Sequence, residues 1–133
     1  MADVGLIGTW TWEPNLIGLR WFLTDVAPLL PRGFKVAVAG RAPPGLPAHA
    51  NVAMLGRVPD AEAFLEGCCT VALCSRGGTG VQLKTIEVLQ AGMPAVATSL
   101  SMRGVAARPG NLVVADDARA FAAGLITLVE QAR

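Results

Sequence analysis

The stretch between residues 71 and 98 places the strongest constraint on the fold of this chain. A short apolar run at 71–74 leads into a glycine-rich turn at 77–80. A pattern typical of an amphipathic helix then continues to Gly92, and a second apolar run follows at 95–97. The predicted order is strand, glycine turn, helix, strand, which is the repeating unit of parallel sheets.

The glycine turn also carries the first chemical signal. Gly78, Thr79 and Gly80 stand where the strand pattern gives way to the helix pattern. Glycine lets a ligand approach the backbone, and the first N–H groups of a helix lack partners within the helix, so the turn suits phosphate. Glu87 lies about two helical turns beyond Gly80, where its carboxylate can accept hydrogen bonds from sugar hydroxyls. Together these features suggest a nucleotide ligand.

Similar patterns recur along the rest of the chain. Apolar runs without polar alternation predict further strands at 4–8, 35–39, 51–55 and 111–115. Such runs are typical of parallel strands that are covered on both faces. The sequence therefore predicts an α/β fold in one domain spanning residues 1–133, with a doubly wound, Rossmann-like parallel six-stranded sheet and helices on both faces.

Helix boundaries follow from capping residues. Asn15 is the predicted N-cap of a first helix that ends near residues 28–31, and Asp60 caps a short helix at 61–67. Either Asp116 or Asp117 caps the last helix. In such sheets ligands bind beyond the carboxyl ends of the strands, which places Arg41, Arg57 and Val58 on the ligand side. These three residues are the candidate contacts to the base of a nucleotide.

Composition narrows the classes of partner. Apolar residues make up 53% of the 133 residues and charged residues 16%, which indicates either doubly covered strands or a surface that meets another domain. No run approaches a membrane span and no leader pattern begins the chain, so a cytoplasmic location is expected. The net charge of +1, with scattered Lys and Arg, argues against nucleic acid as a partner.

The cysteines and the single histidine give no sign of a metal site. Cys68, Cys69 and Cys74 fit neither a disulfide framework nor the usual zinc spacings and are predicted to be buried thiols. His49 lies alone in a proline-rich loop.

Two common nucleotide-binding signatures are missing. The first strand is followed by Gly8-Thr9-Trp10-Thr11-Trp12 rather than G-x-G-x-x-G, which disfavours a dinucleotide fold of the dehydrogenase type. No G-x-x-x-x-G-K-[ST] loop occurs, which excludes hydrolysis of a nucleoside triphosphate by that route.

Four segments instead resemble the C-terminal, donor-binding half of GT-B glycosyltransferases of family 4, the group 1 glycosyl transferases, including their bacterial branch. The longest is similar to the family pattern in which K-x-x-E leads to A-x-G-x-P-V-V-A-T. The resemblance rests on GTWTWEPN at 8–15, GRVPD at 56–60, RGGTGVQLKTIEVLQAGMPAVAT at 76–98 and SLSMRG at 99–104.

The resemblance implies roles for individual residues. Glu87 matches the second acid of the family's E-x7-E motif, which holds the donor ribose hydroxyls. Gly78, Thr79 and Gly80 match the turn that faces the donor diphosphate or sugar. Lys84 matches the helix lysine, which either faces phosphate or pairs with Glu87 at i,i+3.

Departures from the family pattern shift the expected diphosphate contacts. Thr79 stands where the first acid of E-x7-E belongs, and Arg103 stands where the family often has Glu. The basic clamp that many members place after the first strand is not evident in residues 9–15. Diphosphate affinity is therefore expected to rest on backbone groups, Arg76 and Lys84.

The resemblance implies the donor domain of a retaining glycosyltransferase that moves a sugar from a nucleoside diphosphate sugar to a glycan or lipid, without metal or cofactor. The acceptor pocket is expected in an N-terminal domain outside this chain, so the chain alone should bind and not catalyse, and any membrane association should occur only through that domain. The alternative is a non-catalytic nucleotide-sensing or interaction module of the same fold, which Thr79 favours.

The surface expected to meet that other domain can also be predicted. Apolar side chains in the ligand-side loops should form one contiguous patch at the carboxyl end of the sheet. These residues are Trp10, Trp12, Leu46, Met102 and Val105.

Overall fold

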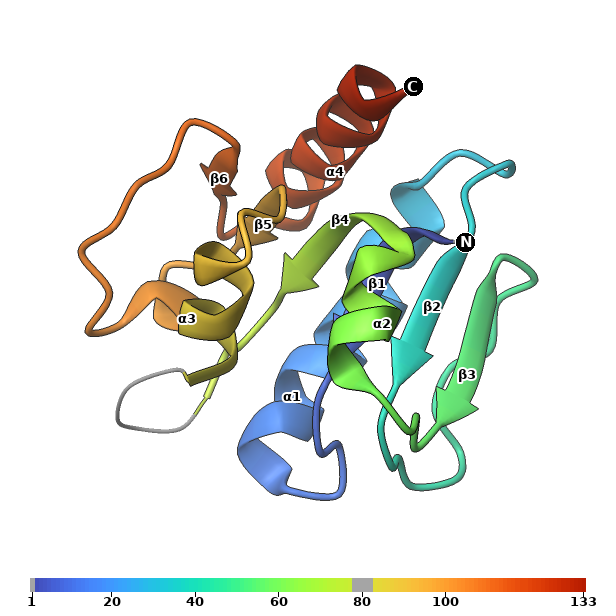
Figure 1. Cartoon of the computed structure of the whole chain (residues 1–133). Helices are drawn as coiled ribbons and strands as arrows, with labels where there is room; N and C mark the ends of the chain where they lie inside the picture. Colours follow the sequence, from blue (N-terminus) through green and yellow to red (C-terminus); the bar gives the residue numbers. More distant parts are fainter. Residues whose placement is uncertain (1, 78–82) are drawn as a thin grey trace.

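A computed structural model describes residues 2–77 and 83–133. Within these residues, six strands form one parallel sheet in the order β3-β2-β1-β4-β5-β6 (Figure 1). The predicted doubly wound α/β fold is confirmed. The strands are β1 (Ala2–Ile7), β2 (Val36–Ala39), β3 (Val52–Gly56), β4 (Cys68–Leu73), β5 (Ala95–Ala97) and β6 (Leu112–Val114).

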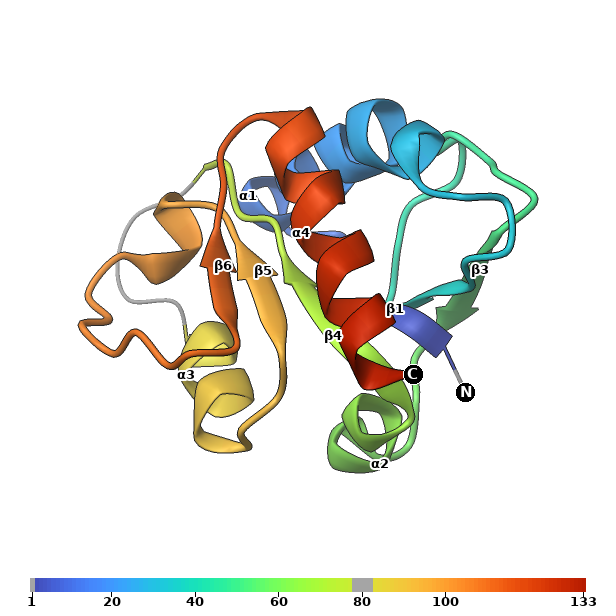
Figure 2. The same ribbon diagram turned by 90° about the horizontal axis from the view of Figure 1, so that it is seen from above.

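Helices cover both faces of this sheet, as predicted. Seen from above, α1 and α4 lie on one face and α2 and α3 on the other (Figure 2). The first helix continues through a π turn, η1, and a 3-10 turn, η2, so it ends where the prolines predict. The bounds are α1 (Glu13–Trp21), η1 (Phe22–Val26), η2 (Ala27–Leu29), α2 (Ala61–Glu66), α3 (Leu83–Gln90), η3 (Leu100–Met102) and α4 (Ala118–Ala132).

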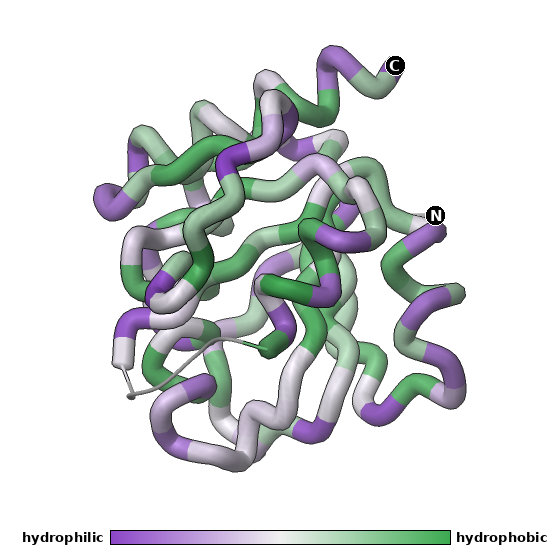
Figure 3. Tube along the Cα trace, turned by 60° about the vertical axis from the view of Figure 1, so that its left-hand side comes forward, coloured by the Kyte–Doolittle hydropathy of each residue, from purple (hydrophilic) through white to green (hydrophobic). Residues whose placement is uncertain are grey.

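Alternation along the strands divides the core into two layers. Val4 and Leu6 of β1 pack with α1, η1 and α4, whereas Val71 and Leu73 of β4 pack with α2 and α3. All four side chains are buried. Hydrophobic segments accordingly run through the middle of the molecule, and hydrophilic ones lie mainly at its margins (Figure 3). Successive side chains of a strand point to opposite faces of the sheet, and helices cover both faces here. Residues on both faces are therefore apolar, which explains the continuous apolar runs in the sequence.

Some element boundaries differ from the prediction. Strand β1 begins at Ala2 and β4 at Cys68, earlier than the apolar runs alone indicate. The prediction that Asn15 caps the first helix is wrong, because Trp12 precedes the helix and Pro14 lies in its first turn. The side-chain amide of Asn15 instead donates to the carbonyl oxygen of Thr9 over 3.0 Å. Asp60 and Asp117 do cap α2 and α4.

Two glycines allow the close approaches that shape the ligand-side edge of the sheet. A Cβ on Gly18 of α1 would lie 2.2 Å from the carbonyl oxygen of Cys74, so this glycine lets the helix lie directly on the end of β4. Gly40 has φ of 112°, and a Cβ there would lie 1.7 Å from the carbonyl oxygen of Gly8. The chain segments that follow β1 and β2 therefore touch.

The predicted apolar patch at this edge does not form as expected. Trp10 is 6% exposed and Met102 4%, because both pack into the core beneath the chain's own loops. Leu46 and Val105 are half-buried against the same core, and Trp12 is 58% exposed. The prediction of one contiguous patch is wrong, because Trp10 and Met102 are buried and anchor their segments to the core.

Candidate functional site

A groove of about 770 Å³ opens beyond the carboxyl ends of β1, β2, β3 and β4. Strand order reverses between β1 and β4, and this switch point is where ligands bind in open α/β sheets. The groove is lined by residues from the ends of these four strands, by the start of α2, by the beginning of α3 and by Ser101 of η3. Most of the segments that the sequence places on the ligand side therefore do meet in one depression.

One wall is the loop that follows β1. Trp10 holds this loop against β2, because its indole N–H donates to the carbonyl oxygen of Ala39 over 2.8 Å. The backbone N–H of Trp10 also donates to the carbonyl oxygen of Arg41 over 2.8 Å. Trp10 therefore acts as a loop anchor, and Thr9 and Asn15 lie beside it on the groove wall.

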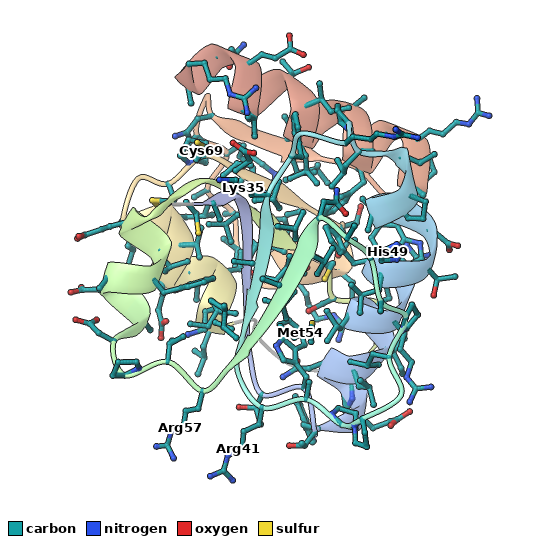
Figure 4. All side chains as sticks on the ribbon, turned by 90° about the vertical axis from the view of Figure 1, so that its right-hand side faces the viewer. Lys35, Arg41, His49, Met54, Arg57 and Cys69 are labelled. Carbon is teal, nitrogen blue, oxygen red and sulfur yellow. The ribbon has the colours of Figure 1, made fainter. Side chains whose placement is uncertain are left out.

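The loops after β2 and β3 each contribute an arginine to the lining of the groove. Arg41, Arg57 and Val58 all line it, which brings together the three residues predicted to face a base. Both guanidinium groups project outward from neighbouring loops, at the end of the sheet opposite Lys35 and Cys69 (Figure 4). The base-contact role itself stays a prediction.

The beginning of α3 carries the acid and the lysine that the sequence singled out. Lys84 and Glu87 both line the groove, and Lys84 Nζ lies 2.9 Å from Glu87 Oε2. Their side chains are 37% and 60% exposed. An ion pair this exposed contributes about 0–1 kcal/mol to stability. The pairing predicted for Lys84 is therefore present, and both charges remain open to the groove.

Arg76 lies apart from this cluster. Its guanidinium carbon is 4.4 Å from the centroid of the Trp21 ring, and Nη1 donates to the carbonyl oxygen of Asp116 over 2.8 Å. It is not among the described residues that line the groove. A phosphate contact from Arg76 is thus not supported by its placement, because stacking and a backbone hydrogen bond direct it elsewhere. Gly78, Thr79 and Gly80 lie outside the described residues.

Asp116 has the most clearly perturbed carboxyl of the described residues. The Ser99 hydroxyl donates to Asp116 Oδ2 over 2.5 Å, and the Ser99 backbone N–H donates to Oδ1 over 2.8 Å. These hydrogen bonds, the hydroxyl bond first, hold the pKa of Asp116 below its ordinary value. Because the pair ties β6 to the loop before η3, we regard it as structural support.

The thiols are not suited to nucleophilic chemistry. Burial raises the pKa of Cys74, which lines the groove, to about 12, and burial also raises the pKa of Cys68 to about 11. Both are buried as predicted, while Cys69 is half-buried. Two thiols that hold their protons at neutral pH behave as small apolar groups.

A buried cluster of hydroxyl groups was missed by the sequence reasoning. Thr85 and Ser101 line the groove beside Ser75, and Thr98 lies behind them. The missed signal was the presence of Ser and Thr in and beside segments that were predicted to be ligand loops.

The structure shows no metal-ligand cluster in the part of the chain that it describes. Across residues 2–77 and 83–133, no three His, Cys, Asp or Glu side chains come together as metal ligands would. Within the same residues, no helix has the length and apolar character needed to cross a membrane.

Comparison with known protein families decides the class. The family "Glycosyl transferases group 1" matches residues 2–131, nearly the whole chain. The chain belongs to this family. No curated protein matches this glycosyl transferase domain.

A solved structure supports the fold of the glycosyl transferase domain. The crystal structure of Anabaena Alr3699/HepE in complex with UDP superposes with a TM-score of 0.74 at 18% sequence identity. The match covers 98% of this chain and 40% of the HepE chain. The glycosyl transferase domain therefore spans less than half the length of that protein, and the resemblance found in the sequence is confirmed at the level of family and fold.

Proposed function

We propose that this chain is the donor-binding part of a glycosyltransferase that uses a nucleoside diphosphate sugar. The observation that carries the proposal is the groove at the switch point, which is lined by Glu87 and Lys84 of α3 and by Arg41 and Arg57 after β2 and β3. A carboxylate suits ribose hydroxyls, and separate cations suit the diphosphate and the base. The UDP bound to HepE is consistent with such a ligand.

The remaining features of the proposal follow from the family resemblance. The acceptor, a glycan or a lipid, would bind a second, N-terminal domain, in line with the 40% of the HepE chain that this one matches. Transfer would retain the configuration of the sugar and need neither metal nor cofactor. The two-domain protein would act in the cytoplasm, and membrane contact would come through the acceptor domain.

Titration calorimetry tests the proposal on the 133-residue chain. UDP, GDP and ADP are titrated beside the matching monophosphates, NAD and glucose. One nucleoside diphosphate should bind with a dissociation constant on the order of 0.1–1 mM, which corresponds to about 4–5.5 kcal/mol of binding free energy. The affinity is expected to be low because one domain supplies only half of the contacts of a two-domain site. Affinity should fall as salt rises, since the diphosphate is held by charge. If no nucleotide gives a binding signal at millimolar concentration, the proposal is overturned. A preference for NAD favours a dinucleotide domain.

A non-catalytic nucleotide-sensing module is the second candidate. Thr79 in place of the first motif acid favours it, and so does Arg76, which stacks on Trp21 away from the groove. Both candidates bind nucleotide, so binding alone does not separate them. Hydrolysis or transfer of the sugar by the protein that includes the acceptor domain separates them: turnover supports the transferase, and tight binding without turnover supports the sensor.

A further inference from the structure

The buried hydroxyl cluster joins four segments of the chain at the groove wall. It consists of Ser75 after β4, Thr98 after β5, Ser101 in η3 and Thr85 in α3. Thr85, Thr98 and Ser101 are 2%, 1% and 1% exposed. Buried hydroxyls are kept when they satisfy other polar groups, so their partners show what the cluster does.

Two of these hydroxyls continue the sheet past the end of β5. The last backbone bond between β4 and β5 runs from the Thr98 N–H to the Leu73 carbonyl oxygen, 2.9 Å. β5 then turns into η3, while the chain after β4 runs on to Ser75. There Ser101 Oγ accepts from the Ser75 N–H over 2.9 Å, and Thr98 Oγ1 donates to the Ser75 carbonyl oxygen over 2.5 Å. Side chains thus replace the strand that would otherwise satisfy the backbone of Ser75.

Ser101 holds a further contact on each side. Its hydroxyl donates to the carbonyl oxygen of Leu73 over 2.8 Å, and its Oγ lies 2.9 Å from Thr98 Oγ1. Its own carbonyl oxygen accepts from the Thr85 hydroxyl over 2.7 Å. One residue therefore links the chain after β4 to α3. These two stretches flank residues 78–82 in the sequence, and both line the groove.

We propose that Ser101 is a positioning residue for diphosphate recognition, which fixes the end of β4 relative to the beginning of α3. The inference rests on the proposed nucleotide-binding function and adds the means by which the site is held in shape. Polar groups bind a diphosphate well when packing and hydrogen bonds to neighbouring residues hold them in the required geometry. Ser101 itself need not touch the ligand.

The test compares hydroxyl deletions inside and outside the cluster. Ser101→Ala and Thr85→Val remove the link, and Thr85→Ser keeps the hydroxyl. Thr70→Val is the matched control, because Thr70 is fully buried and its hydroxyl donates to the Pro94 carbonyl oxygen over 3.0 Å, away from the groove. Each variant is titrated with the nucleoside diphosphate that the wild type binds and with its monophosphate.

Ser101→Ala and Thr85→Val should raise the dissociation constant of the diphosphate about tenfold and reduce the preference for diphosphate over monophosphate. Thr70→Val and Thr85→Ser should keep that preference even where they lower the melting temperature. Hydrogen exchange without ligand should show faster exchange of the Ser75 N–H in Ser101→Ala and wild-type exchange there in Thr70→Val.

The outcomes separate the two proposals. If the wild type binds no nucleoside diphosphate, the proposed function fails and the role of Ser101 in recognition falls with it. If the wild type binds and Ser101→Ala and Thr85→Val keep the wild-type preference for diphosphate, the positioning role alone is overturned. Should Ser101→Ala not fold, the Thr85→Val and Thr85→Ser pair still decides.

Discussion

Glu87 occupies a position where charge matters for binding and little for folding. Its carboxylate pairs with Lys84 on an exposed helix face and lines the groove. Glu87→Gln should weaken binding of the nucleoside diphosphate by about 1.5–3 kcal/mol, the range for a hydrogen bond to a charged group, with little change in melting temperature. Calorimetry and thermal unfolding measure the two effects.

A suitable control for this substitution is Glu130→Gln, which removes an exposed acid near the end of α4. It should change neither quantity. A fall in melting temperature with unaltered binding in Glu87→Gln would show instead that the carboxylate serves the helix.

Asp116 is the residue whose titration should report the contact between Ser99 and the end of β6. Its folded-state pKa is lowered, so the contact stabilises the fold above the ordinary carboxyl pKa of 3.8 and is lost as pH falls through the lowered value. Ser99→Ala should move the pKa of Asp116 upward and reduce the loss of stability in acid. Carboxyl ¹³C titration measures the shift, and Ser99→Thr, which keeps a hydroxyl, should retain most of the lowering.

At the scale of elements, the contact of α1 with the end of β4 depends on Gly18. Alanine is the better helix former by about 1 kcal/mol, but its Cβ would meet the Cys74 carbonyl oxygen at 2.2 Å. Gly18→Ala should therefore lower the free energy of unfolding by about 1–3 kcal/mol, as overpacking does. Gly33→Ala is the control, because nothing lies within 4 Å of its added Cβ. Urea unfolding compares them, and equal stabilities would contradict the assigned contact.

How much of these elements could be predicted depends on how local their causes are. Apolar runs and capping aspartates are local signals. The order of strands and helices along the chain and the caps at Asp60 and Asp117 therefore follow from the sequence. Asn15 is not the cap, because the helix already begins before it, with Pro14 in the first turn. The side-chain amide of Asn15 donates to the Thr9 carbonyl oxygen instead. The early starts of β1 and β4 depend on pairing between distant strands, Ala2 with Cys68, which no local pattern contains.

The same distinction holds in the site. That Arg41 and Arg57 line the groove could be predicted, because a doubly wound sheet places the ends of its strands together. Glu87 and Lys84 were expected there from their spacing after the glycine turn and from the family resemblance, and they line the groove as well. The roles of all four residues toward a ligand stay predictions. The orientation of Arg76 toward Trp21 and the hydroxyl bonds of Ser101 depend on tertiary contacts between segments far apart in sequence.

At the scale of the whole molecule, the groove joins the two halves of the sheet, β1 to β3 and β4 to β6. A ligand held by both halves should stabilise the fold as a unit. At 10 mM nucleoside diphosphate and the affinity expected above, mass action contributes about 1.4–2.7 kcal/mol, and the melting temperature should rise on the order of 4–14 °C. Differential scanning calorimetry measures the shift. Glucose at the same concentration should give none, and an equal rise with glucose would point to a nonspecific solvent effect.

The central pairing of the sheet has a consequence for synthesis on the ribosome. β1 is made first, yet one of its two neighbours, β4, begins only at Cys68. At roughly 5–20 residues per second, translation takes about 3 to 13 s to cover that interval. During this time β1 can pair with β2 and pack against α1, but its other edge waits for β4. The nascent chain should therefore be a client for chaperones that bind extended apolar segments until β4 emerges.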